Sequence, residues 1–290
     1  LAEGLLLKAA GMSESDIYYR GLSQLSLARV NNLLSQKNIS QEEAKTQFTN
    51  YMGGAIQNAK QAIAYDSTNY ANWLNLGGVY EAVTPLGING AYDEAFKSYA
   101  KALELAPKNP YIYYSMGRLE VANKKTDKAR EYLNKALSLK SNYTDALFFL
   151  SQIEASEGNL SEAISKTEQA ALLAPDNAGL FFQLGLLKYS AKDYEGAITA
   201  LERATVLSKD YANAMYFLGL SYDKAGRKED ALKQFTRISE LNPDNNEVKT
   251  IIKNLKAGKS ALTGISSPNN APEKGKTPPI KETGKSSNEL

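Results

Sequence analysis

The chain has 290 residues, of which 43% are hydrophobic, and it carries 34 basic and 32 acidic side chains. It contains neither Cys nor His, which excludes disulfides, thiolate nucleophiles, histidine bases and the usual zinc sites. Residues 259–290 hold five Lys and three Glu, which leaves 29 basic and 29 acidic side chains in residues 1–258. That balance argues against nucleic-acid binding. No apolar run approaches the roughly 18 residues of a membrane span, so we expect no membrane insertion.

The first 69 residues predict helices ahead of a regular array. Residues 1–15 are expected to be the remnant helix of a preceding repeat, in a chain that we expect to be a fragment because it begins with Leu. Residues 16–69 predict a degenerate helical hairpin, since apolar residues recur at helical spacing and small residues follow in its second half. The small residues are Ala55, Ala59 and Ala62.

Residues 70–245 are periodic, with a step of 34 residues. An alanine recurs at this step: Ala95, Ala129, Ala163, Ala197 and Ala231. A second small column is formed by Gly117, Ser151, Gly185 and Gly219. A fixed period of this length predicts a solenoid of helical hairpins, in which small residues allow close helix packing. We place five units at 70–109, 110–143, 144–177, 178–211 and 212–245.

The end of the chain predicts a cap and a tail. Residues 246–258 place apolar side chains on one helical face, which indicates a capping helix. Residues 259–290 lack aromatic residues and contain four Pro, so we expect a disordered tail. The string Gly258-Lys259-Ser260 resembles the end of a phosphate loop, but it lacks the glycine required five residues before its Gly-Lys pair. We therefore expect no enzyme, no cofactor and no metal.

The repeats resemble the tetratricopeptide repeat family. The first unit carries its motif as Trp73, Leu76, Gly77 and Tyr80, followed by Ala95, Tyr99, Ala102 and Pro107. The resemblance implies an all-α, right-handed superhelix that serves as a non-enzymatic protein-interaction scaffold. It also implies that certain first-helix columns face a concave groove that binds a protein or peptide. The residues in these columns are Leu74, Tyr111, Tyr114, Arg118, Phe148, Gln152, Phe182, Tyr189 and Tyr216.

Three alternatives stay open at this point. The aromatic side chains of these columns could be packing between repeats rather than a binding surface. The stretch Asp16-Ile17-Tyr18-Tyr19-Arg20 is similar to the C-terminal repeat region of bacterial membrane proteins of the O-antigen ligase or polymerase type, which would make the chain a soluble appendage of a glycan-handling enzyme. Self-association through residues 1–15 is the third. The sequence does not decide between a cytoplasmic and a membrane-tethered location.

Overall fold

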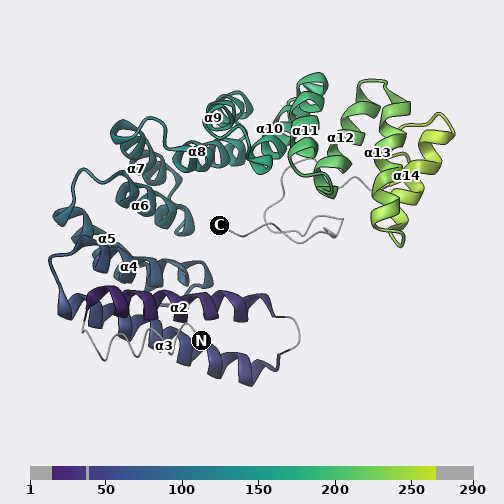
Figure 1. Ribbon diagram of the computed structural model, residues 1–290. Coiled ribbons are helices and arrows are strands. Elements are labelled where there is room, and N and C mark those ends of the chain that lie inside the picture. Colours follow the sequence, from purple (N-terminus) through teal and green to yellow (C-terminus); the bar gives the residue numbers. More distant parts are fainter. Residues whose placement is uncertain (1–14, 37–38, 266–290) are drawn as a thin grey trace. The chain divides into compact units, whose positions relative to one another are not determined.

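The computed structural model describes residues 15–36 and 39–265, and the regular elements of this part of the chain are all helical (Figure 1). The chain divides into two compact units, Leu1–Ser141 and Asn142–Leu290. The expected all-α solenoid of hairpins is confirmed within each unit. Residues 1–14, where a remnant helix is expected, lie outside the described residues.

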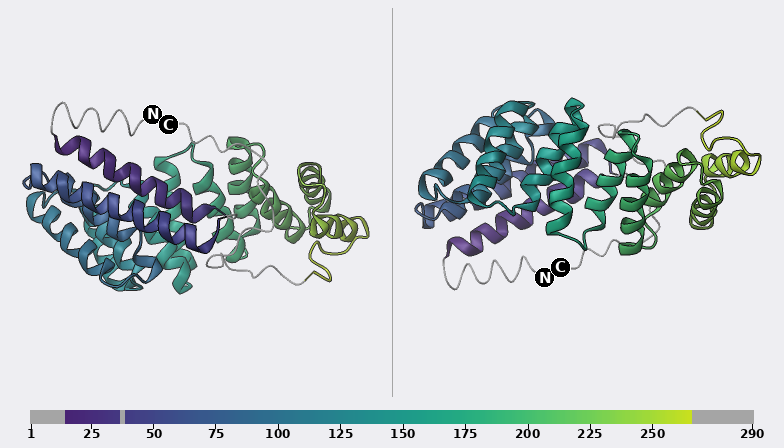
Figure 2. Two further views of the ribbon diagram at one scale, coloured as in Figure 1. Left: turned by 90° about the horizontal axis from the view of Figure 1, so that it is seen from below. Right: turned by 90° about the horizontal axis from the view of Figure 1, so that it is seen from above.

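The first unit contains three helical hairpins. Its elements are α2 (Asp16–Ser35), α3 (Gln41–Tyr65), α4 (Tyr70–Glu81), the short 3₁₀ helix η1 (Thr84–Leu86), α5 (Ala91–Leu105), α6 (Pro110–Ala122) and α7 (Thr126–Leu139). Helices α2 and α3 lie side by side and have 20 and 25 residues (Figure 2). Residues 16–65 thus contain two helices in contact, and their interpretation as a degenerate repeat stays a prediction. The predicted alanine column of α3 is fully buried.

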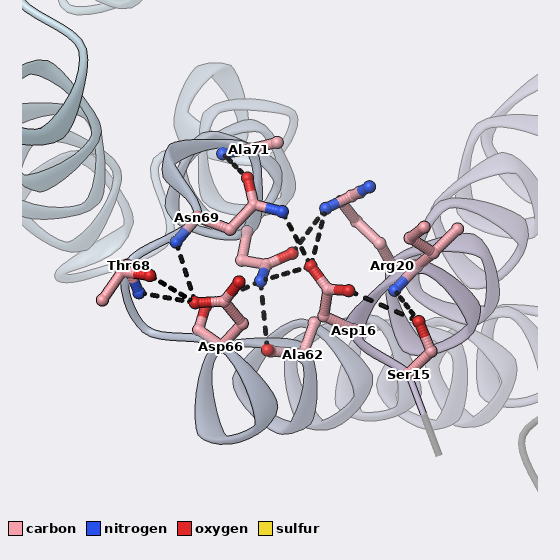
Figure 3. Close-up of polar contacts among 10 residues, drawn as sticks. Ser15, Asp16, Arg20, Ala62, Asp66, Thr68, Asn69 and Ala71 are labelled. Atoms are coloured by element: carbon pink, nitrogen blue, oxygen red, sulfur yellow. Dashed lines mark hydrogen bonds and ion pairs between the residues drawn. The ribbon is translucent and has the colours of Figure 1, made fainter. Parts of the chain in front are cut away.

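A polar cluster fixes the start of α2 to the turn between α3 and α4 (Figure 3). The Asp16 carboxylate accepts hydrogen bonds from the Asn69 amide at 2.8 Å and from the Asn72 amide at 3.0 Å. The fully buried Asn72 also accepts a 2.7 Å hydrogen bond from Arg20 and donates to the Asp66 carbonyl. Because its buried polar groups are paired with one another, the cluster stabilises this junction.

The second unit contains three hairpins and a final helix. Its elements are α8 (Thr144–Glu157), α9 (Leu160–Leu173), α10 (Ala178–Ser190), α11 (Tyr194–Leu207), α12 (Ala212–Lys224), α13 (Lys228–Leu241) and α14 (Asn246–Lys256). Helix α14 lies within residues 246–258, where we predict a capping helix. It buries Val248, Ile251 and Leu255 in the hydrophobic cluster that also contains residues of α12 and α13.

The prediction that disorder begins at residue 259 is wrong for residues 259–265. The Asp223 carboxylate accepts hydrogen bonds from the Ser260 hydroxyl at 2.7 Å and from the Ala261 amide at 2.9 Å. The Asn254 side chain donates to the carbonyls of Ala261 and Thr263. These bonds between side chains and backbone order a segment that its composition marks as polar and flexible. Residues 266–290 of the expected tail lie outside the described residues.

Small residues allow the two helices of each repeat to approach closely. The alanines of the 34-residue column have no exposed surface. A Cβ atom built on Gly185 would lie 2.4 Å from Leu201 Cγ, and one on Gly117 would lie 2.8 Å from Leu133 Cγ. The third repeat has Ser151 in place of this glycine. Its partner is Thr167 rather than leucine, and their hydroxyl oxygens are 2.5 Å apart.

The turn between the two helices of a repeat contains a left-handed residue. These residues are Gly90, Lys124, Gly158, Lys192 and Gly226, with φ angles of 77°, 60°, 87°, 63° and 80°. Their spacing is again 34 residues. Glycine adopts the left-handed conformation without steric cost, whereas lysine, which has a Cβ atom, adopts it at a cost. The period therefore extends to backbone conformation, although the residue type alternates.

Candidate functional site

In the first unit, the predicted groove residues lie on α4 and α6. The Tyr111 ring is 46% exposed, and its centroid lies 6.0 Å from that of Tyr114. The guanidinium carbon of Arg118 lies 5.6 Å from the Tyr114 ring centroid. Leu74 packs against the hydrophobic cluster that contains residues of α5 and α6. The predicted column thus offers an exposed tyrosine here, whereas Leu74 contributes to packing.

Arg118 is held by a buried carboxylate. Its Nε donates to Glu81 Oε1 at 2.9 Å, Nη2 donates to the same oxygen, and the Tyr99 hydroxyl donates to the other oxygen. Burial and the Glu81 charge raise the pKa of Tyr99 well above its usual value. Burial alone would lower the pKa of Arg118, but the Glu81 charge raises it above its ordinary value. Arg118 therefore links α4 and α6 as a permanent cation.

In the second unit, Phe148 and Phe182 line an open cleft of about 430 Å³. Tyr211 is a further wall, with its ring centroid 4.9 Å from that of Phe182. Asp145 and Gln183 also line the cleft and add polar groups. The cleft is thus an apolar hollow, formed by α8, α10 and the residue before α12, with a few polar side chains. This is the usual composition of a ligand-binding site.

The local structure fixes these side chains at the beginnings of helices. The Asn177 side chain caps α10 by accepting hydrogen bonds from the backbone amides of Gly179 and Leu180, at 3.0 and 3.3 Å. Phe182 and Gln183 follow within the first turns of that helix, and Asp145 lies in the first turn of α8. Side chains on capped helical turns hold their positions better than side chains on loops.

The groove prediction is wrong for Tyr216 and Tyr189, because both side chains are buried in the core. Tyr216 is 1% exposed, and its hydroxyl donates to Glu247 of α14 at 2.5 Å. The Tyr189 ring packs edge-on against Tyr194 and Phe217, and burial raises the pKa of Tyr189 to about 12. Following helices cover both columns at this end of the unit, so these tyrosines offer no surface to a ligand.

Gln152 is exposed on α8 but does not line the cleft. Conversely, Tyr211 and Gln183 line the cleft although the sequence did not predict them as groove residues. The position before the first helix of a repeat is an asparagine cap at Asn177 and at Asn245, whereas a tyrosine stands there at residues 143 and 211. Tyr143 is buried and Tyr211 lines the cleft, so the missing cap does not by itself mark a cleft residue.

The described helices include none that is long and apolar enough to cross a membrane. In residues 15–36 and 39–265, no group of three or more acidic residues is placed to hold a metal ion. The ionisable and hydroxyl groups that line the cleft are the carboxyl group of Asp145 and the hydroxyl groups of Thr144 and Tyr211.

Comparison with known proteins identifies the repeats. The family described as tetratricopeptide repeat matches residues 88–147 and 188–255. No curated protein matches the chain. PilF of Pseudomonas aeruginosa is similar in structure, with a TM-score of 0.59 and 16% identity over 86% of this chain and 100% of that chain. PilW, a type IV pilus biogenesis factor, has a TM-score of 0.56 and 18% identity over 79% of this chain and 99% of its own.

A chain in the Cut9–Hcn1 complex of the APC/C is also similar, with a TM-score of 0.52 and 18% identity. The match covers 83% of this chain and 48% of that chain, so this chain spans about half the length of that relative. At these identities the likeness concerns the fold alone.

Proposed function

Because the chain is built from tetratricopeptide repeats, a fold that commonly serves as a protein-interaction scaffold, we propose that it binds an extended peptide segment of a partner protein. The binding site is the cleft of the second unit, between α8 and α10. The observation that carries this function is the convergence of Phe148, Phe182 and Tyr211 on one open hollow of about 430 Å³.

The chemistry of the cleft favours a peptide over a small polar molecule. Aromatic side chains bury large areas at little entropic cost and dominate the affinity of most interfaces. The polar groups of Asp145 and Gln183 provide hydrogen bonding at the cleft. Asp145 is exposed, so its carboxylate favours ligands that place a Lys or Arg beside the apolar anchors. Since Phe148 and Phe182 stand on the helices α8 and α10, little additional ordering is needed on binding.

The exposed Tyr111 and the half-buried Tyr114 of the first unit provide a second aromatic surface. We assign it a separate, secondary binding role within the first unit.

The experiment selects peptides from a displayed random library on the intact chain and then compares variants. Phe148→Ala and Phe182→Ala should each weaken the selected peptides by about 30-fold, and Phe148→Ala/Phe182→Ala by more, since central aromatic anchors contribute about 2 kcal/mol or more each. Asp145→Lys tests the same site without removing any apolar contact. It should discriminate against peptides rich in Lys and Arg.

The matched control is Leu172→Ala/Val206→Ala, which removes two exposed apolar side chains of α9 and α11. This control should bind like the parent chain. Circular dichroism of every variant verifies that the helices persist. Equal affinity of the parent and the Phe148→Ala/Phe182→Ala variant would contradict binding in the cleft.

The resemblance to O-antigen ligases and polymerases stays a prediction. Asp16 and Arg20, two of the residues that carry it, form internal hydrogen bonds to the α3–α4 turn and to α4. Their presence is therefore explained by the structure of the junction. Self-association through residues 1–15 also stays a prediction, since residues 1–14 lie outside the described part.

A further inference from the structure

We propose that the cleft is occupied in the free chain by the chain's own segment Thr277-Pro278-Pro279-Ile280-Lys281, which an outside peptide must displace. This occupancy presupposes that the cleft binds extended peptides, as proposed above. It adds an identified ligand and a form of regulation. The ligand is a proline-rich segment with a basic residue, and its source is the same molecule.

The first argument is where the described chain ends. Leu262 and Ile265 pack against the same hydrophobic cluster as Phe182 and Tyr211, two walls of the cleft. Hydrogen bonds from Ser260 and Ala261 to Asp223 hold the segment that leads to them. Ile265, the last described residue, therefore packs on the unit that contains the cleft.

The second argument is length. Thr277 lies twelve positions after Ile265, with eleven residues between them, and an extended chain spans at most about 3.3 Å per position, or about 40 Å in total. Packed helices lie about 8–10 Å apart. The cluster that holds Ile265 includes residues of α10, α11, α12, α13 and α14. The distance from α14 back to α10 thus lies within the reach of twelve positions.

The third argument is chemical complementarity. Proline-rich segments adopt an extended left-handed helix at low entropic cost and dock in grooves lined by aromatic side chains. Pro278, Pro279 and Ile280 match the apolar walls, and the ammonium group of Lys281 matches the exposed carboxylate of Asp145. Such a charge pair also selects one direction of binding.

The same comparison disfavours the other prolines of the tail. Pro268 and Pro272 are single prolines rather than a pair, and Lys274 is the one basic residue within two positions after either of them. Glu273 follows Pro272 directly and would meet Asp145 as a like charge. The chain thus contains its own matched control for the segment 277–281.

The absence of cysteine makes a direct test practical. A single Ser286→Cys variant of the intact chain carries a nitroxide five residues beyond Lys281. Methyl resonances of Leu180 and Thr144, which line the cleft, are compared with those of Leu172, which is exposed on α9. Paramagnetic broadening of the cleft resonances alone is the expected result. Uniform or absent broadening overturns the inference.

Variants separate the segment from the rest of the tail. Pro278→Gly/Pro279→Gly should abolish the broadening and should tighten the binding of a library-selected peptide several-fold, because a larger fraction of clefts is free. The control Pro268→Gly/Pro272→Gly should leave both unchanged. Equal effects of the two variants would show a general property of the tail and would contradict the assignment to residues 277–281.

Two further outcomes keep the inference distinct from the proposed function. If selected peptides bind the cleft and the broadening is absent, the proposed function stands and self-occupancy is refuted. If broadening is present and no outside peptide binds, the self-occupancy stands and the scaffold function fails. A mixture of nitroxide-labelled chains and isotope-labelled chains locates the source. Broadening in that mixture alone would mean that a second copy supplies the segment and would overturn the intramolecular form.

Discussion

The contact between the two helices of a repeat can be tested by replacing the contacting residue pair of one repeat with the pair found in another. The third repeat packs Ser151 against Thr167, with 2.5 Å between their hydroxyl oxygens. The fourth repeat packs Gly185 against Leu201 at the equivalent positions. We predict that Gly185→Ser and Leu201→Thr are each destabilising and that together they partly compensate.

The magnitudes follow from the geometry. A Cβ atom on Gly185 would lie 2.4 Å from Leu201 Cγ and 2.7 Å from its Cδ2, well inside the roughly 3.5–4.0 Å of a normal carbon contact. Such overpacking costs about 1–3 kcal/mol, of which serine recovers about 0.5 kcal/mol through its higher helix propensity. Leu201→Thr removes buried methyl groups and adds a hydroxyl, which costs about 2–4 kcal/mol.

The double variant removes the clash and pairs the new hydroxyl groups. Independent effects would sum to roughly 3–6 kcal/mol, whereas relief of the clash and one added hydrogen bond should return about 1–3 kcal/mol of coupling. Urea denaturation followed by circular dichroism gives the overall free energy of unfolding. Hydrogen exchange of the α10 and α11 amides gives the local effect, because repeat arrays depart from two-state unfolding. Additivity within about 0.5 kcal/mol would refute the reasoning.

Three more predictions concern a turn, a buried junction and the cleft. Lys192 adopts a left-handed conformation, so Lys192→Gly should raise the free energy of unfolding by about 0.5–1 kcal/mol, and the reverse exchange Gly158→Lys should lower it; urea denaturation measures both. Burial alone would raise the pKa of Asp16, but hydrogen bonds from two asparagine amides and the charge of Arg20 lower it. Its contribution to stability is therefore present above about pH 4 and is lost as the pH falls through the folded pKa, and Asp16→Asn should flatten that part of the pH–stability curve. Tyr211→Asn should give α12 a side-chain cap, worth about 1 kcal/mol, and remove a wall of the cleft, so peptide affinity should fall while the melting temperature stays level or rises; a fall in both would contradict the two separate roles.

The helices and their packing could be predicted because the 34-residue period records them directly. A position such as Ala163 or Gly185 must be small wherever two helices meet, so its residue type repeats with the structure. The order of residues 259–265 could not be predicted in this way. It depends on Asp223, which is distant from Ser260 in the sequence, and on Asn254, which belongs to α14. The residue types of Asp223 and Asn254 do not indicate these contacts.

The candidate site was predictable in part, for a related reason. A column tells which helical face a residue occupies but not what covers that face. Phe148 and Phe182 lie in the same column as Tyr216, yet only the first two line a cleft. Glu247 of α14 lies over Tyr216 and accepts its hydroxyl hydrogen bond. The fate of each aromatic residue is set by the element that follows it, which the repeat motif does not specify.

A second period, of 68 residues, is related to the position of the cleft. Left-handed turn residues alternate between glycine and lysine, and the residue before the first helix alternates between asparagine and tyrosine, as Asn177, Tyr211 and Asn245 show. Both alternations have a step of 68 residues from residue 109 on, so the hairpins from there repeat in pairs, although Asn69 and Asn109 cap the first helices of two successive repeats. The cleft lies in one such pair, where an asparagine caps α10 and a tyrosine replaces the cap before α12. The packing of the helices thus depends on residues that repeat every 34 positions, whereas the cleft depends on a residue that differs from its equivalents one repeat away. Tyr211 stands where Asn177 and Asn245 cap their helices, and its ring forms a wall of the cleft.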